Sequence, residues 1–132
     1  MTFEPRPRSD GAARARNDRE NLLDELHRID ERLRRRVIGT DRVAFHDGSD
    51  AYDAASMAIV RLHGVLERRE HAFLLEAVRE VELRAIGTIR NIVSHGGYRS
   101  MDDESFWETV TGQLPELLQR LLERAASWPA PR

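Results

Sequence analysis

Apolar residues recur at alternating three- and four-residue steps through most of this chain, and that spacing places them on one face of an α-helix. The clearest run is Leu22, Leu26, Ile29, Leu33 and Val37. Three further runs with helical spacing follow it, and no stretch of useful length alternates apolar and polar residues as a strand does. The sequence therefore predicts an all-α fold, an antiparallel four-helix bundle with short connections.

Capping residues and glycines set the expected boundaries of the first two helices. The first helix should begin at Asn17 and end before Gly39. Residues 1–16 carry two prolines and little that is apolar, so we expect a disordered N-terminal arm, followed by a helical domain over residues 17–128. The second helix should start near Asp50. Its expected buried residues are Tyr52, Ala55, Ile59, Leu62 and Leu66.

The third helix should end at Gly96-Gly97, because two successive glycines do not sustain a helix. Its expected apolar stripe is Leu74, Ala77, Val78, Val81, Ala85, Ile89 and Ile92. Acidic residues at 76, 80 and 82 alternate with arginines and are expected on a solvated, ion-paired face.

The fourth helix should be capped by Ser100 and Asp103, and Pro115 should kink it or split it into two segments. Its expected buried residues are Phe106, Val110, Leu114, Leu117, Leu121 and Ala125.

Composition excludes several classes of chemistry. The chain has no cysteine, so disulfides, thiolate metal sites and cysteine nucleophiles are absent. All 21 basic residues are arginine, which leaves no Schiff-base lysine and no phosphate loop that depends on lysine. A net charge of −2 argues against a general nucleic-acid coat protein. No apolar run approaches the roughly 20 residues of a membrane-spanning helix, and the N-terminus lacks the apolar core of a secretory signal, so we expect a cytoplasmic protein.

The most informative polar residues are Arg90, Asn91 and His95, at the end of an otherwise apolar helix. Imidazole can take a proton from a ribose 2′-hydroxyl and later return one. Guanidinium can hold a phosphate through two hydrogen bonds and stabilise the charge of the transition state, while an asparagine amide can orient either group. These three side chains therefore suit phosphodiester cleavage without a metal, although an Arg-x4-His pair also arises by chance in arginine-rich helices.

The spacing of these residues raises a geometric difficulty. Asn91 and His95 are four residues apart and share a helix face, whereas Arg90 and His95 lie about 140° apart around an ideal helix. They can converge if the helix loosens at Ser94, if the arginine side chain bends round, or if a second chain contributes to the site.

Arg90-Asn91-x3-His95, late in the third predicted helix, resembles the signature of the HEPN superfamily, which is an arginine, a polar residue, three variable residues and a histidine. The residues that follow are similar to the HepT-like branch, with a tyrosine, an acidic helix start, an aromatic and a Leu-Pro pair. They read Tyr98, Asp102-Asp103, Phe106-Trp107 and Leu114-Pro115-Glu116-Leu117. The resemblance covers residues 86–122 closely and residues 17–66 more loosely.

This resemblance implies a homodimeric, metal-independent endoribonuclease that acts as the toxin of a toxin–antitoxin pair, with a minimal nucleotidyltransferase as its antitoxin. It implies that Arg90 binds the scissile phosphate, that His95 is the general acid and base, and that Asn91 supports them. In the family, residues of both subunits form the active site at the dimer interface. No cofactor or metal is implied, and the other histidines lack the spacing of a metal site.

The tyrosine that the family's partner enzyme modifies with AMP would correspond to Tyr98. The family spacing is His-x-Tyr, whereas Gly96 and Gly97 separate His95 from Tyr98 in this chain. An ordinary loop tyrosine is therefore the alternative interpretation. For the chain as a whole, the alternatives are a non-catalytic HEPN module that binds a nucleotidyltransferase partner or a nucleotide, and a purely structural helical bundle.

Overall fold

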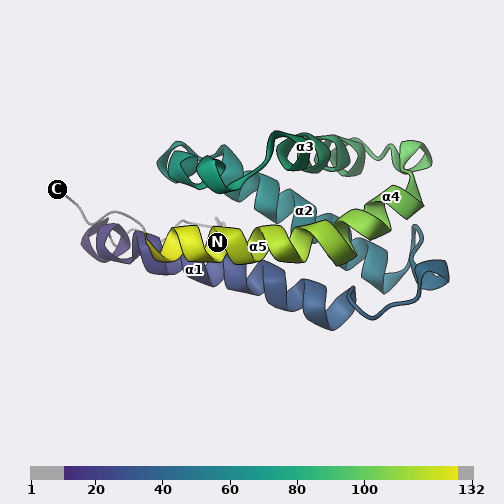
Figure 1. Cartoon of the computed structure of the whole chain (residues 1–132), viewed down its shortest axis with the longest axis horizontal. Coiled ribbons are helices and arrows are strands. Elements are labelled where there is room, and N and C mark those ends of the chain that lie inside the picture. Colours follow the sequence, from purple (N-terminus) through teal and green to yellow (C-terminus); the bar gives the residue numbers. More distant parts are fainter. Residues whose placement is uncertain (1–10, 128–132) are drawn as a thin grey trace, which may run out of the picture.

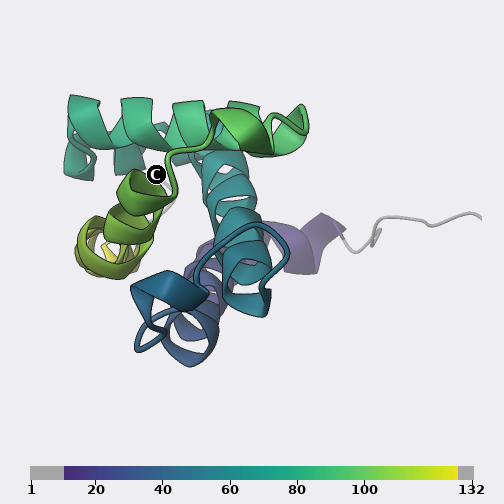
Figure 2. The same ribbon diagram turned by 90° about the vertical axis from the view of Figure 1, so that its right-hand side faces the viewer.

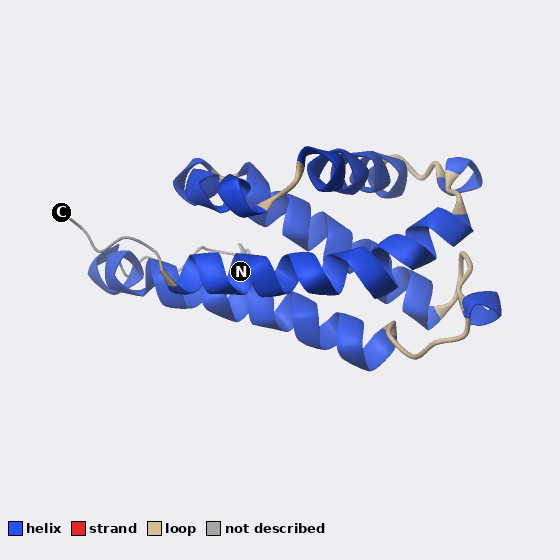
Figure 3. Cartoon of the chain, viewed as in Figure 1, coloured by secondary structure: helices blue, strands red, loops and turns tan. Residues whose placement is uncertain are grey.

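A computed structural model of the chain describes residues 11–127, with side chains from residue 18 onward. Every regular element in that range is helical, which confirms the all-α prediction (Figure 3). The α-helices are α1 (Gly11–Arg36), α2 (Asp50–Glu67), α3 (Glu80–Ser94), α4 (Asp103–Glu108) and α5 (Leu114–Ala126). Shorter helical turns connect them, namely η1 (Arg42–Ala44), η2 (Arg69–Ala77), η3 (Tyr98–Ser100) and the π-helical η4 (Thr109–Gln113).

Three of the long helices lie side by side along the molecule. α1 packs against both α2 and α5, and each of these two runs in the opposite direction to α1 (Figure 1). α3 departs from this plan, because it packs on α2 but runs across the long axis, as Figure 2 shows. The antiparallel arrangement expected for the four helices is therefore seen for α1, α2 and α5, and α3 crosses them.

The first helix begins at Gly11, earlier than the expected start at Asn17. Alanine and arginine, which have high helix propensity, make up most of residues 12–16, and this explains the longer helix. That part of the expected disordered arm is therefore helical. Residues 1–10, and residue 128 at the expected end of the domain, lie outside the described residues.

The third apolar run is divided between two elements. Its first residues lie in η2, the chain is extended at Val78 and Arg79, and α3 starts at Glu80. Because this break shifts the helical register, Val81 is 64% exposed, and its predicted place in the core is wrong. Glu82 is buried, so its predicted place on a solvated face is also wrong.

A contact with α5 explains where α3 begins. The Glu82 carboxylate accepts a hydrogen bond of 2.9 Å from the backbone N–H of Arg79 and another of 2.6 Å from the guanidinium of Arg120. Arg120 also donates to the carbonyl of Ala77 at 3.1 Å. These bonds fix the break between η2 and α3 through residues that are distant in the sequence.

The last helical segment runs through α4, η4 and α5. Its N-cap is Asp102, whose carboxylate accepts from the Ser105 N–H at 3.1 Å, rather than Ser100 or Asp103 as expected. The π-helical turn ends at Gln113, two residues before Pro115, which has no N–H to give to a preceding carbonyl. Thr111 donates its hydroxyl to the Trp107 carbonyl at 2.7 Å, which satisfies one backbone acceptor in this turn.

The core matches the predicted stripes of the first, second and fourth runs, and every residue predicted in these three stripes is buried. At the end of the molecule where α2 and α4 begin, Phe45, Tyr52 and Phe106 form an aromatic cluster with ring centroids 5.1 Å apart in each pair. The Tyr52 hydroxyl is buried, and the carboxylate of Asp103 lies near it. Burial is the main cause that raises the pKa of Tyr52 to about 12, and the nearby carboxylates of Asp103 and Asp47 add to it.

None of the helices in the described range combines the length and the apolar character that crossing a bilayer requires.

Candidate functional site

The predicted site lies where α3 ends, and a glycine turn stops the helix there. Gly96 adopts a φ of +66°, a left-handed conformation that favours glycine. Its N–H bonds to the Val93 carbonyl at 3.4 Å, and the Gly97 N–H bonds to the Ile92 carbonyl at 2.9 Å. This pair of bonds is the Schellman motif, which satisfies the carbonyls left open at a helix end. His95 is the C-cap residue of α3, as the glycine pair predicted.

The polar side chains at this end make few contacts with the rest of the fold. The Arg90 guanidinium donates one hydrogen bond of 3.3 Å to the side-chain oxygen of its neighbour Asn91. Asn91 and His95 are exposed. Within the described part of the chain, the imidazole of His95 has no hydrogen bond or ion pair, and none joins it to Arg90. Within a single copy of the chain, no hydrogen bond therefore joins the arginine to the histidine, and their spacing corresponds to about 140° around an ideal helix.

Tyr98 follows the glycine turn and opens η3. Its ring is partly buried against the core, with its centroid 6.1 Å from that of Tyr52. The turn is closed by hydrogen bonds from the Ser100 N–H to the Gly97 carbonyl at 2.8 Å and from the Met101 N–H to the Tyr98 carbonyl at 3.1 Å. Tyr98 thus ties the segment after His95 to the aromatic cluster.

An apolar groove of about 370 Å³ lies beside the site, between α3 and the start of α4. One edge is a row on α3 formed by Val81, Ala85, Thr88 and Ile92, and the other edge includes Met101 and Phe106. His95 follows Ile92 by three residues, so it continues the same row at the helix end. No sequence pattern predicts this groove, because the apolar spacing of the third run predicts Val81 in the core.

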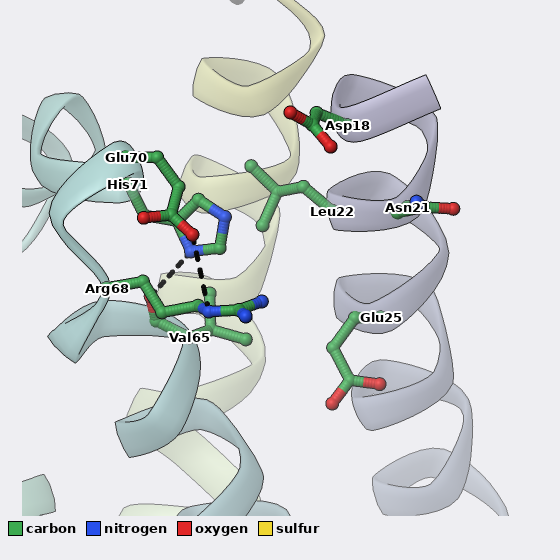
Figure 4. A pocket seen from close by; sticks show the side chains of 8 residues that line it. All are labelled: Asp18, Asn21, Leu22, Glu25, Val65, Arg68, Glu70 and His71. Atoms are coloured by element: carbon green, nitrogen blue, oxygen red, sulfur yellow. Dashed lines mark hydrogen bonds and ion pairs between the residues drawn. The ribbon is translucent and has the colours of Figure 1, made fainter. Parts of the chain in front are cut away.

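A second cavity, of about 420 Å³, lies between α1, the end of α2 and η2 (Figure 4). His71 and Leu22 project into it, and the Nδ1 of His71 lies 2.7 Å from the Val65 carbonyl, so that Nδ1 carries the proton. Arg68 and Glu70 pair with each other at its edge, at 3.4 Å. None of the predicted site residues lines this cavity. Its residues come from distant segments, which no sequence motif connects.

No group of three or more histidine, aspartate and glutamate side chains is arranged to hold a metal ion in the described part of the chain.

Comparisons of the chain with protein-family models, with curated proteins and with solved structures found no significant match.

Proposed function

We propose that this chain is a metal-independent endoribonuclease of the HEPN type, acting as the toxin of a pair with a minimal nucleotidyltransferase antitoxin. The observation that carries the proposal is the end of α3, where His95 is exposed and has no side-chain hydrogen bond or ion pair within residues 18–127, and where Arg90 hydrogen-bonds only to Asn91. The imidazole, the guanidinium and the amide at this helix end are therefore available to a substrate. Together these three groups suit phosphodiester cleavage.

In the proposed reaction, His95 removes the proton from a ribose 2′-hydroxyl, and the 2′-oxygen attacks the adjacent phosphorus. The bond from phosphorus to the 5′-oxygen breaks, that oxygen takes up a proton from an imidazolium, and the products are a 2′,3′-cyclic phosphate and a 5′-hydroxyl. Arg90 binds the phosphate and stabilises the added negative charge of the transition state. Asn91 orients the guanidinium that it already contacts.

The same proposal includes a homodimer with a composite active site. The spacing of Arg90 and His95 corresponds to about 140° around an ideal helix, so a second copy is the simplest source of the missing partner group. The groove along Val81 and Ile92 supports this, because it is apolar and open, and because Ile92 stands three residues before His95 on the same helix. Val81→Glu should therefore lower both the dimer population, measured by analytical ultracentrifugation, and the cleavage rate.

The decisive experiment measures cleavage of a labelled RNA by purified protein in the presence of a metal chelator. His95→Ala and Arg90→Ala should each lower the rate by about 10²- to 10⁴-fold. His27→Ala and Arg69→Ala are matched controls, since both residues are exposed and lie outside α3, and they should cleave like the parent protein. Cleavage that survives His95→Ala, or that requires a divalent metal, would contradict the proposal.

A non-catalytic HEPN module is the second candidate, and the separation of Arg90 from His95 within one copy favours it. Such a module would bind a nucleotidyltransferase partner or a nucleotide through the end of α3 and would leave RNA intact. A stable complex with the partner, combined with no cleavage by the parent protein, would favour this function.

Modification of Tyr98 by AMP also belongs to the proposal. Incubation with a minimal nucleotidyltransferase and ATP should add one AMP to the parent protein and none to Tyr98→Phe, as measured by mass spectrometry. Because the Tyr98 ring packs beside Tyr52, the same variant keeps the ring contact and tests the hydroxyl alone.

A further inference from the structure

The outer face of α1 carries an arginine stripe, which we define as Arg28, Arg32 and Arg36. These residues are spaced four apart, so they follow one another along one side of the helix. All three are exposed, and together with Glu31 and Arg35 they line a hollow of about 210 Å³. The lining residues all belong to α1, so no other helix covers the stripe.

The fold does not neutralise this stripe. Four acidic residues of α1 lie within four positions of the stripe, and three of them pair with other arginines. Asp30 pairs with Arg34 at 3.0 Å, Glu31 pairs with Arg35 at 2.7 Å, and Glu25 pairs with Arg61. The fourth, Asp24, stands one turn before Arg28 and makes no ion pair with it. Within residues 18–127, the three guanidinium groups of the stripe have no ion pair and no hydrogen bond. Like charges four residues apart destabilise a helix slightly, so the stripe works against the stability of α1.

The helix dipole explains only part of the stripe. Cations stabilise the last turn of a helix, and Arg36 stands in that turn together with Arg34 and Arg35. Arg28 and Arg32 precede that turn, where the dipole effect has faded. An external anion would balance the charge that the fold leaves open.

We propose that the arginine stripe binds the phosphate backbone of RNA, as a contact surface separate from the cleavage site. The inference rests on the proposed function in taking RNA as the polyanion. Guanidinium groups match phosphate oxygens through paired hydrogen bonds, and a row of them along about 12 Å of helix suits a linear chain of phosphates. α1 and α3 lie on opposite sides of the molecule in Figures 1 and 2, so only a long RNA reaches both surfaces.

Binding is tested with His95→Ala protein and labelled poly(U), which separates affinity from cleavage. Arg28→Gln/Arg32→Gln should weaken binding roughly tenfold and reduce the slope of log affinity against log salt by about 1.4, or about 0.7 for each lost phosphate contact. Arg68→Gln/Arg69→Gln is the matched control, because it removes the same charge from exposed residues elsewhere and should change affinity less than twofold. Equal effects of the two double variants, or no binding of poly(U), would overturn the proposal.

Substrate length gives a second readout. With His95 intact, Arg28→Gln/Arg32→Gln should slow cleavage of a long RNA through a higher KM and leave cleavage of a dinucleotide unchanged. If His95→Ala loses cleavage but still binds poly(U), both the nuclease mechanism and the RNA-binding stripe are supported. If His95→Ala still cleaves RNA, the nuclease mechanism is refuted, and the proposal for the stripe is not. If the double variant loses binding of poly(glutamate) but not of poly(U), the stripe serves an acidic protein and the RNA assignment is wrong.

Discussion

The two ends of α3 carry similar polar groups but use them differently. At the N-terminal end, Glu82 is buried and bonded to both the Arg79 N–H and the Arg120 guanidinium. At the C-terminal end, the half-buried Arg90 hydrogen-bonds only to its neighbour Asn91 within the described residues, and His95 is exposed. A buried carboxylate must be paired, so the first end is structural, whereas exposed polar groups make little difference to folding and are free for a ligand.

The largest expected effect comes from removing the partner of Glu82. Arg120→Met should lower the free energy of unfolding by about 3 kcal/mol, because it leaves a carboxylate buried without its counter-charge. This is the lower end of the range for buried pairs, since the Arg120 side chain is 30% exposed. Urea denaturation measures the change. The double variant Glu82→Leu/Arg120→Met should regain most of the lost stability, because no buried charge is left. An unchanged urea midpoint for Arg120→Met alone would show that the Glu82–Arg120 pair does not stabilise the fold.

The next largest effect concerns Tyr52 of the aromatic cluster, which packs beside Tyr98 in the segment that follows the C-terminal end of α3. Folding raises the pKa of Tyr52 from 10.0 to about 12, so the folded chain holds the phenolic proton more tightly than the unfolded chain does. The resulting stability is complete below pH 10 and is lost as the pH rises from 10 to 12, with a magnitude of about 2–3 kcal/mol. Urea midpoints across this range should fall for the parent and for Tyr98→Phe, but less for Tyr52→Phe. An equal fall in Tyr52→Phe would contradict the assignment.

A smaller effect is expected at the turn that ends α3. Gly96→Ala should destabilise the fold by about 1–2 kcal/mol, because alanine is strained at a φ of +66°. Gly87→Ala in the same helix is the control. A Cβ there meets no atom within 4 Å, and the change should stabilise the helix by up to about 1 kcal/mol. Thermal unfolding of the two variants should shift in opposite directions, and a shared direction would argue against the special role of the turn.

The smallest effect on stability is expected at the proposed site itself. His95→Ala and Arg90→Ala should each change the free energy of unfolding by no more than about 0.5 kcal/mol, because within residues 18–127 neither side chain forms a hydrogen bond or an ion pair with another helix. A loss comparable to that of Arg120→Met would mean that both ends of α3 are structural. Calorimetry on the purified variants distinguishes these outcomes.

Local pattern was sufficient for most of the helices. The stripes that include Leu26, Ile59 and Leu117 are buried as predicted, because each depends only on spacing within one helix. For the third run, the predicted burial of Val81 was wrong. The helical conformation is interrupted at Val78 and Arg79, and the helix that follows starts in another register. That break is held by Arg120 of α5, and no local pattern contains such a contact.

For the candidate site, the sequence alone determined that Arg90, Asn91 and His95 stand at a helix end, because the successive Gly96 and Gly97 do not sustain a helix. Tertiary structure decided which polar groups the fold uses. It buried Glu82 and set Tyr98 beside Tyr52, and it left the arginines of the stripe without an ion pair within the described residues. Helix formation follows from neighbours in the chain, whereas burial and charge pairing depend on groups that only folding brings together.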